Sequence, residues 1–246
     1  MEVDILKKIL DTKAEEIPAI QLPKQKVERL SGVPSFKSQF EQGKKFIAEF
    51  KRKSPSAGWI NQHAKVSQVL QSYTEAIPEV AGFSVLTDTQ YFGGGIQDLQ
   101  EAVRSVSCPV IRKDFIVHPK QIEEAYLSGA SAILLIAAAL SKSAVAELVT
   151  EAESYGLEVL FEIKELEELT KLDDRIALLG VNNRDLRTFE TDYRKSIRFA
   201  PQLPTDRILI SESGLSQQHQ FDELEEVGYK GFLVGQGFME LYSEQA

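Results

Sequence analysis

The chain has 246 residues, of which 43% are hydrophobic and 26% charged, a composition typical of a folded globular protein and unlike that of a disordered one. Its net charge of −9 argues against general nucleic-acid binding, because contacts with phosphate backbones need clusters of basic side chains. The single cysteine, Cys108, excludes an internal disulfide and a metal site built from several cysteines.

Neither a membrane segment nor a secretion signal is predicted. The longest apolar stretch, residues 132–140, is much shorter than the roughly 20 residues that span a bilayer. The first residues alternate acidic and basic side chains and lack the apolar run of a signal peptide. We therefore expect a cytoplasmic protein with no nucleic-acid or membrane partner, and a monomer, with weak oligomerisation left open.

Residues 1–44 are predicted to form an N-terminal helical extension. Their apolar spacing favours a helix over 3–16, and Pro23 and Pro34 punctuate the segment that follows. We expect this extension to pack on residues 45–246 and to form one structural domain with them.

From residue 45 onward, short apolar runs rich in Val, Ile and Leu alternate with helical patterns, which is typical of parallel strands buried on both faces. The starts of successive runs lie 20 to 37 residues apart, about the length of one strand and one helix. The eight predicted strands are 45–50, 82–86, 109–112, 132–136, 158–161, 178–181, 207–210 and 231–234.

Amphipathic helices are predicted between these strands, where apolar residues recur three or four positions apart. Eight strand–helix units close most naturally into a (β/α)8 TIM barrel, for which about 250 residues is the usual length. A doubly wound open sheet is the alternative, but no Gly-x-Gly-x-x-Gly turn follows the first strand. The predicted helices are 95–106, 119–128, 143–155, 164–172 and 216–227.

Polar residues follow or end several predicted strands, where barrel enzymes carry their active sites. Glu49 and Lys51 share strand parity, so both should point into the barrel mouth. Lys113 ends the third strand, Glu162 the fifth, and Asn182 follows the sixth. A structural ion pair or loop-anchoring hydrogen bonds would explain each residue singly, but their gathering at one rim favours catalysis. A lysine there serves as a proton donor or as an amine nucleophile, and the residue types leave both open.

Two glycine turns follow the last two strands, Ser213-Gly214 and Gly235-Gln236-Gly237. Barrels often bind phosphate at this place with backbone amides, and glycine lets the backbone approach the ligand closely. The turns therefore predict a small phosphorylated substrate. No metal site is predicted, because His63, His118 and His219 are scattered without ligand spacing, and Trp59 is expected to pack against its neighbours.

The same residues carry a resemblance to the indole-3-glycerol-phosphate synthase family over nearly the whole chain. Five motifs resemble those of the family in its order: Ile-Ala-Glu-Phe-Lys-Arg-Lys-Ser-Pro-Ser at 47–56, Ser-Val-Leu-Thr-Asp at 84–88, Arg-Lys-Asp-Phe-Ile at 112–116, Asn-Asn-Arg-Asp-Leu at 182–186 and Ser-Glu-Ser-Gly at 211–214. The resemblance implies a carboxy-lyase of tryptophan biosynthesis that needs no cofactor. Its reaction converts 1-(2-carboxyphenylamino)-1-deoxyribulose 5-phosphate to indole-3-glycerol phosphate, carbon dioxide and water.

The resemblance also implies roles for residues of this chain. Lys113 is the expected general acid, and Glu162 and Lys51 are expected to assist the loss of water, with the division of proton transfers left open. The other residues expected in the catalytic set are Glu49 and Asn182, which orient the substrate and the lysines, and Ser213. The expected substrate contacts are apolar walls around the aniline ring (Phe92, Phe115, Leu134, Leu233), Lys53 and Ser54 on the phosphate side, Arg184 at the carboxylate, and Glu212, Gly214, Gly235 and Gln236 in the phosphate turns.

Two other functions remain open on the residues alone. A Schiff-base aldolase would use Lys113 or Lys51 as its nucleophile. A non-catalytic phosphosugar-binding barrel is the second, because a fold does not guarantee chemistry.

Overall fold

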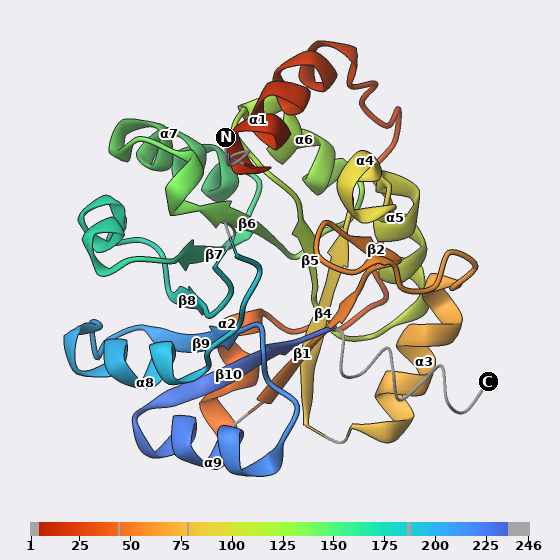
Figure 1. Ribbon diagram of the computed structural model, residues 1–246. Helices are drawn as coiled ribbons and strands as arrows, with labels where there is room; N and C mark the ends of the chain where they lie inside the picture. Colours follow the sequence, from red (N-terminus) through yellow and green to blue (C-terminus); the bar gives the residue numbers. More distant parts are fainter. Residues whose placement is uncertain (1–4, 44, 78, 186–187, 236–246) are drawn as a thin grey trace.

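The computed structural model describes residues 5–43, 45–77, 79–185 and 188–235 (Figure 1). Within these residues, parallel strands form a closed barrel in which each strand pairs with the next along the chain and the last pairs with the first. This is the predicted TIM barrel. Its strands are β1 (Lys45–Phe50), β4 (Val80–Leu86), β5 (Val110–Lys113), β6 (Ala132–Ile136), β7 (Glu158–Ile163), β8 (Leu178–Asn182), β9 (Ile208–Glu212) and β10 (Tyr229–Val234).

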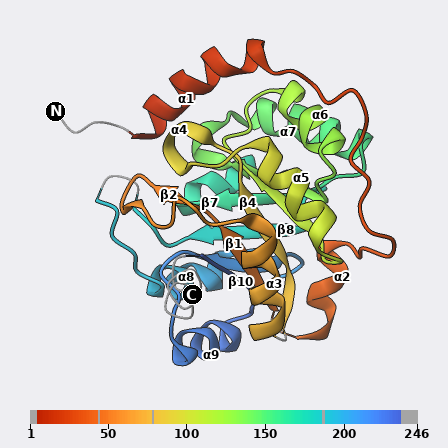
Figure 2. The same cartoon turned by 90° about the vertical axis from the view of Figure 1, so that its right-hand side faces the viewer.

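Helices surround the barrel and connect its strands (Figures 1 and 2). They are α3 (Val66–Ala76), α5 (Ile96–Ser105), α6 (Pro119–Leu127), α7 (Lys142–Ser154), α8 (Arg194–Phe199) and α9 (Gln218–Glu226), with the short α4 (Thr89–Phe92) after β4. The predicted helix over 164–172 is instead the 3-10 helix η4 (Leu166–Lys171). Further 3-10 turns are η1 (Ile17–Ala19), η2 (Phe40–Gln42), η3 (Ala137–Ala139) and η5 (Ala200–Gln202).

The apolar core has an inner and an outer layer, as alternation along buried strands requires. Side chains such as Ile47, Leu160 and Ile210 fill the barrel, while Phe83 and Leu179 point outward against the helices. All five are fully buried. Charged groups at the strand ends therefore stand on a dry apolar floor, where electrostatic interactions are stronger than in water.

The segment before β1 closes the N-terminal end of the barrel. Helix α2 (Phe36–Gln39) lies at the end opposite to the short hairpin that follows β1 (Figure 2). The rings of Phe36 and Phe40 are buried in the inner layer. The backbone amides of Phe36 and Lys37 donate hydrogen bonds of 2.6 and 2.9 Å to the carboxylate of Glu158, which fixes α2 to β7.

Helix α1 (Ile5–Glu16) lies beside α4 and α6 at the other end (Figures 1 and 2). Its Lys13 is buried, and the Nζ atom pairs with Asp88 at 2.8 Å and with Asp114 at 3.0 Å. These carboxylates raise the pKa of Lys13 against the opposing effect of burial. Because Asp88 and Asp114 follow β4 and β5, this ion-pair cluster fastens α1 to the rim that carries the predicted active site.

No helix in the described ranges is both long and apolar enough to cross a membrane.

Candidate active site

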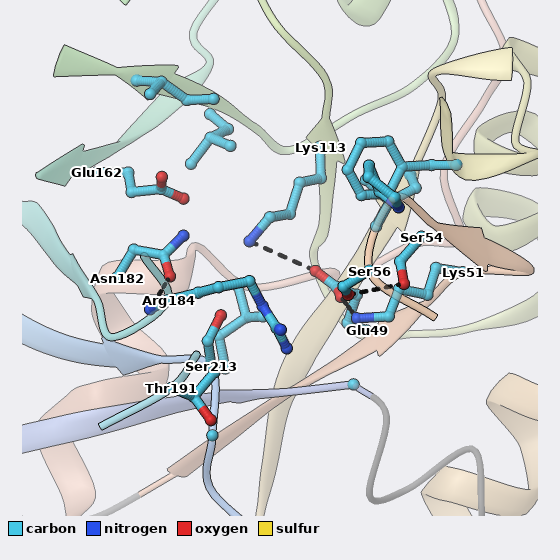
Figure 3. Close-up of a pocket in the computed structure, with 18 of the residues that line it drawn as sticks. Glu49, Lys51, Ser54, Ser56, Lys113, Glu162, Asn182, Arg184, Thr191 and Ser213 are labelled. Carbon is cyan, nitrogen blue, oxygen red and sulfur yellow. Dashed lines mark hydrogen bonds and ion pairs between the residues drawn. The ribbon is translucent and has the colours of Figure 1, made fainter. Parts of the chain in front are cut away.

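A pocket of about 380 Å³ opens at the C-terminal ends of the barrel strands (Figure 3). Helix α1 forms part of its wall through Ile5 and Ile9. Most residues predicted for the site line this pocket, although they come from almost every part of the chain. They are Glu49, Lys51, Ser54, Phe92, Lys113, Phe115, Leu134, Glu162, Asn182, Arg184, Ser213, Gly214, Leu233 and Gly235, whereas Gln236 lies outside the described residues.

Lys113 stands at the centre of a charge cluster on the pocket floor. Its Nζ atom lies 2.8 Å from a carboxylate oxygen of Glu212 on β9 and 3.4 Å from one of Glu49 on β1. The other oxygen of Glu49 accepts a hydrogen bond of 2.9 Å from Lys51. Glu162 points toward the same space from β7 (Figure 3). Lys113 therefore faces carboxylates from several strands.

These neighbours fix the charges of the cluster. Burial acts to lower the pKa of Lys113, but Glu212, Glu49 and Glu162 outweigh it and raise this pKa above its ordinary value. Burial likewise acts to raise the pKa of Glu49, and Lys51 and Lys113 together lower it to about 2. At neutral pH, Lys113 is an ammonium and Glu49 a carboxylate. In this state Lys113 carries a proton that it can donate, and the negative charge of Glu49 holds the ammonium in place.

Glu212 occupies a different place from the one expected. It was predicted in a phosphate turn, but its side chain is fully buried in the barrel and is absent from the pocket lining. Burial raises the pKa of Glu212 to about 7, against the opposing effect of Lys113. Its carboxylate contacts Lys113 at 2.8 Å and does not reach the pocket surface.

Gly180 on β8 makes the room for Glu212. A Cβ atom at position 180 would lie 2.1 Å from Oε1 of Glu212, much closer than van der Waals contact allows. We expect Gly180→Ala to displace Glu212 from Lys113, to destabilise the fold by about 1–3 kcal/mol and to lower turnover by up to about a hundredfold. Chemical denaturation and steady-state kinetics measure the two effects.

The matched control for this substitution is Gly95→Ala at the start of α5. Gly95 has extended backbone, and a Cβ atom there would meet only the flexible end of Gln97 at 3.0 Å. We expect the control to keep the activity of the parent and to lose less than about 1 kcal/mol of stability, because alanine is a poorer helix N-cap than glycine. Equal losses of turnover and stability in both variants would show that neither depends on the close approach of Gly180 and Glu212.

An apolar wall lies on the β4–β6 side of the pocket. The rings of Phe92 and Phe115 stand 6.1 Å apart, tilted by 37°. Leu134 on β6 lies beside them, and Ile5 and Ile9 of α1 extend this apolar wall. Such a wall suits a planar aromatic ring, which buries its faces against apolar side chains.

The glycine turns lie on the β9–β10 side. Ser213 and Gly214 have φ angles of 71° and 74°, in the left-handed region that glycine adopts without strain. A Cβ atom on Gly214 would lie 2.7 Å from that of Thr191, and one on Gly235 would lie 2.7 Å from Oε1 of Glu49. A side chain at either glycine would therefore clash, and both glycines line the pocket.

Asn182 and Arg184 close the gap between these two sides. The Oδ1 atom of Asn182 accepts a hydrogen bond of 2.9 Å from the backbone amide of Arg184, which fixes the turn after β8. Arg184 donates from Nη1 to the carbonyl of Phe189 at 2.8 Å. Its guanidinium points toward Ser213 and Glu49 (Figure 3).

Lys53 and Trp59 also differ from the prediction. They lie in the hairpin formed by β2 (Lys53–Ser54) and β3 (Gly58–Trp59), where Lys53 donates to the carbonyl of Gln90 at 2.9 Å and does not line the pocket. Trp59 is 52% exposed, so the expected packing against its neighbours is only partial. Only Ser54 of the predicted pair faces the pocket, where its Oγ accepts from the amide of Ala57.

Some residues that line the pocket were not among those predicted from the sequence. The i, i+4 spacing of Ile5 and Ile9 places both on one helix face, but nothing in the sequence tells which surface that face covers. Lys164 shares strand parity with Glu162 and lines the pocket beside it, a signal that was available from the sequence. The histidines His63, His118 and His219 are exposed.

Comparison with known proteins agrees with this geometry. A family model described as indole-3-glycerol phosphate synthase matches residues 6–246. A protein of that name from Bacteroides thetaiotaomicron is 42% identical over 246 residues, which cover 96% of this chain and 93% of that protein. Another of that name, from Burkholderia cenocepacia, is 39% identical over 247 residues, covering 96% and 94%.

A solved structure supports the fold. A mutant tryptophan synthase alpha-subunit from Pyrococcus furiosus superposes with a TM-score of 0.61 over 83% of this chain and 92% of that chain. At 15% sequence identity this likeness concerns the barrel alone and not its chemistry. The family model and the relatives at 42% and 39% identity, which cover almost the whole chain, establish that it belongs to the indole-3-glycerol phosphate synthase family.

Proposed function

We propose that this protein converts 1-(2-carboxyphenylamino)-1-deoxyribulose 5-phosphate to indole-3-glycerol phosphate, with release of carbon dioxide and water. The observation that carries the proposal is the Lys113 ammonium, held by Glu212 at 2.8 Å and Glu49 at 3.4 Å on the floor of a pocket with an apolar wall. Ring closure requires a proton donor at a carbonyl oxygen, and this lysine is positioned to be that donor.

In the first step, a ring carbon attacks the ribulose carbonyl and negative charge develops on its oxygen. Lys113 stabilises this charge and transfers a proton to the oxygen. Loss of carbon dioxide then restores the aromatic ring. Glu162 and Lys51 are the pair proposed to assist the loss of water, which needs one group to protonate the leaving hydroxyl and another to accept a proton. Glu49 and Asn182 orient the lysines and the substrate.

The two sides of the pocket match the two ends of the substrate. The aniline ring is proposed to bind against Phe92, Phe115 and Leu134, and the phosphate at the backbone turns of Gly214 and Gly235. Arg184 was expected at the carboxylate. Because its guanidinium points toward Ser213 and Glu49 (Figure 3), we place it on the phosphate side instead.

The alternatives are less well supported. A Schiff-base aldolase needs a lysine that is a neutral amine, whereas the pKa of Lys113 is raised by Glu212 and Glu49 against burial. The Nζ atom of Lys51 is paired with Glu49 at 2.9 Å. A binding-only barrel would not need a charge cluster of this kind in its floor.

The proposal extends to the organisation of the protein. The contacts of Lys13 with Asp88 and Asp114 support a single structural domain made of residues 1–44 and 45–246. We propose that this unit acts as a cytoplasmic monomer that binds no nucleic acid, in keeping with its net charge of −9. Sedimentation measures the oligomeric state.

Turnover tests the proposed function directly. Purified protein is mixed with the carboxyphenylamino-deoxyribulose phosphate, and the indole fluorescence of the product is followed. We expect fluorescence to rise in proportion to enzyme concentration, with one carbon dioxide released for each indole formed. A folded protein that binds the substrate without producing indole would support the binding-only barrel, and trapping of the substrate by borohydride would support the aldolase.

A further inference from the structure

Three lysines line the described part of the pocket, and Lys164 differs from the other two. Lys51 and Lys113 are each paired with a carboxylate at 2.9 and 2.8 Å. The ammonium of Lys164 forms no ion pair or hydrogen bond with any side chain in the described ranges, although its backbone amide donates to Glu168. A half-buried cation without a partner is costly unless a ligand supplies one.

The charges around Lys164 come from several elements. Glu162 precedes it on β7, Glu168 belongs to η4, Asp185 to the loop after β8, and Lys195 to α8. Burial lowers the pKa of Lys164 and Lys195 adds to this, while the acidic neighbours only partly oppose them. An anion bound beside Lys164 would offset both unfavourable effects.

The position of Lys164 on the rim determines which anionic group of the substrate it can contact, the carboxylate or the phosphate. It follows β7, which neighbours β6 with Leu134 and Ile136 of the apolar wall. The glycine turn of Gly214 follows β9, two strands away, which is about 10 Å along the rim. A substrate with its ring on the apolar wall and its phosphate at the glycine turns brings its carboxylate, and not its phosphate, to β7.

We propose that Lys164 binds the carboxylate of the substrate. The inference rests on the proposed function and names the group that recognises the acidic end of that substrate. The carboxylate stays on the ring throughout ring closure, so the contact stabilises the bound substrate and the ring-closure transition state equally and does not accelerate that step. Its loss should therefore raise KM and leave kcat near that of the parent.

The experiment compares two non-reacting ligands in which the ribulose carbonyl is reduced to an alcohol. One carries the carboxylate on the ring, and the other has hydrogen in its place. In Lys164→Met, we expect the affinity for the first ligand to fall about tenfold, as for one charge-assisted hydrogen bond, and that for the second to change less than about twofold. Lys164→Arg keeps the charge and should retain the preference for the carboxylated ligand.

Other outcomes overturn the inference. Equal losses for both ligands would place Lys164 at the phosphate or in a structural role, and unchanged affinity for both would remove it from binding. A fall in kcat with unchanged KM would indicate that it acts through Glu162. Thermal unfolding of both variants identifies a folding defect, and turnover by the parent is measured separately, so failure of the proposed function is recognised independently.

Discussion

Lys113→Ala is expected to lower kcat/KM by roughly a thousandfold while the protein stays folded. The substitution removes the proton donor of ring closure and the positive charge that stabilises the developing oxyanion. The buried Glu212 loses its partner, but burial has already raised the pKa of this carboxyl to about 7, so it takes up a proton instead of remaining as an unpaired charge. Indole fluorescence measures turnover, and circular dichroism checks the fold.

The control for Lys113 is Lys142→Ala, at the exposed start of α7. It removes the same side chain at a position that does not line the pocket, and should leave turnover unchanged. Turnover within about tenfold of the parent in folded Lys113→Ala would contradict the general-acid role, because donors of this kind contribute at least about a hundredfold.

Lys13→Met is expected to lower the free energy of unfolding by about 3 kcal/mol or more. Lys13 and its partners Asp88 and Asp114 have side-chain exposures of 4%, 0% and 3%, so removing the ammonium leaves carboxylates in a dry environment. Asp114 retains Arg112 at 3.2 Å, and the larger part of the loss therefore falls on Asp88. Chemical denaturation measures the change in stability.

The same variant should raise KM, because α1 carries Ile5 and Ile9 into the pocket wall. Lys7→Met provides a control on the same helix: Lys7 pairs with Asp11 at 2.6 Å, but its side chain is 71% exposed. Surface pairs of this kind contribute less than about 1 kcal/mol. Similar losses of stability in the two variants would mean that Lys13 is no more than a surface contact.

The barrel could be predicted from the sequence because its strands are buried on both faces and read as apolar runs. The ends of β7 and β9 were placed too early, since the predictions stopped at Phe161 and Ile210 whereas the strands continue to Ile163 and Glu212. Inward-facing acids interrupt the apolar pattern without interrupting the strand. Acids that were predicted for the site are thus the ones that obscured the strand ends.

The pocket floor was harder to predict than the rim. Strand parity correctly placed Glu49 and Lys51, but parity holds only along a strand, and Lys53 enters a hairpin that turns its side chain toward Gln90. The partner of Lys113 is Glu212, 99 positions later in the chain. Such a pair depends on closure of the barrel, which brings β5 and β9 face to face across its interior.

The hairpin after β1 has a consequence for spectroscopy. Trp59 is the only tryptophan in the sequence, so its emission comes from one known place. One edge of its ring lies so close to Gly93 that a Cβ atom there would come within 2.8 Å, and the Nζ atom of Lys53 lies 5.6 Å from the ring centre. Gly93 follows Phe92, which lines the pocket. The protein thus contains an intrinsic optical reporter of movement at the rim, which needs no added dye.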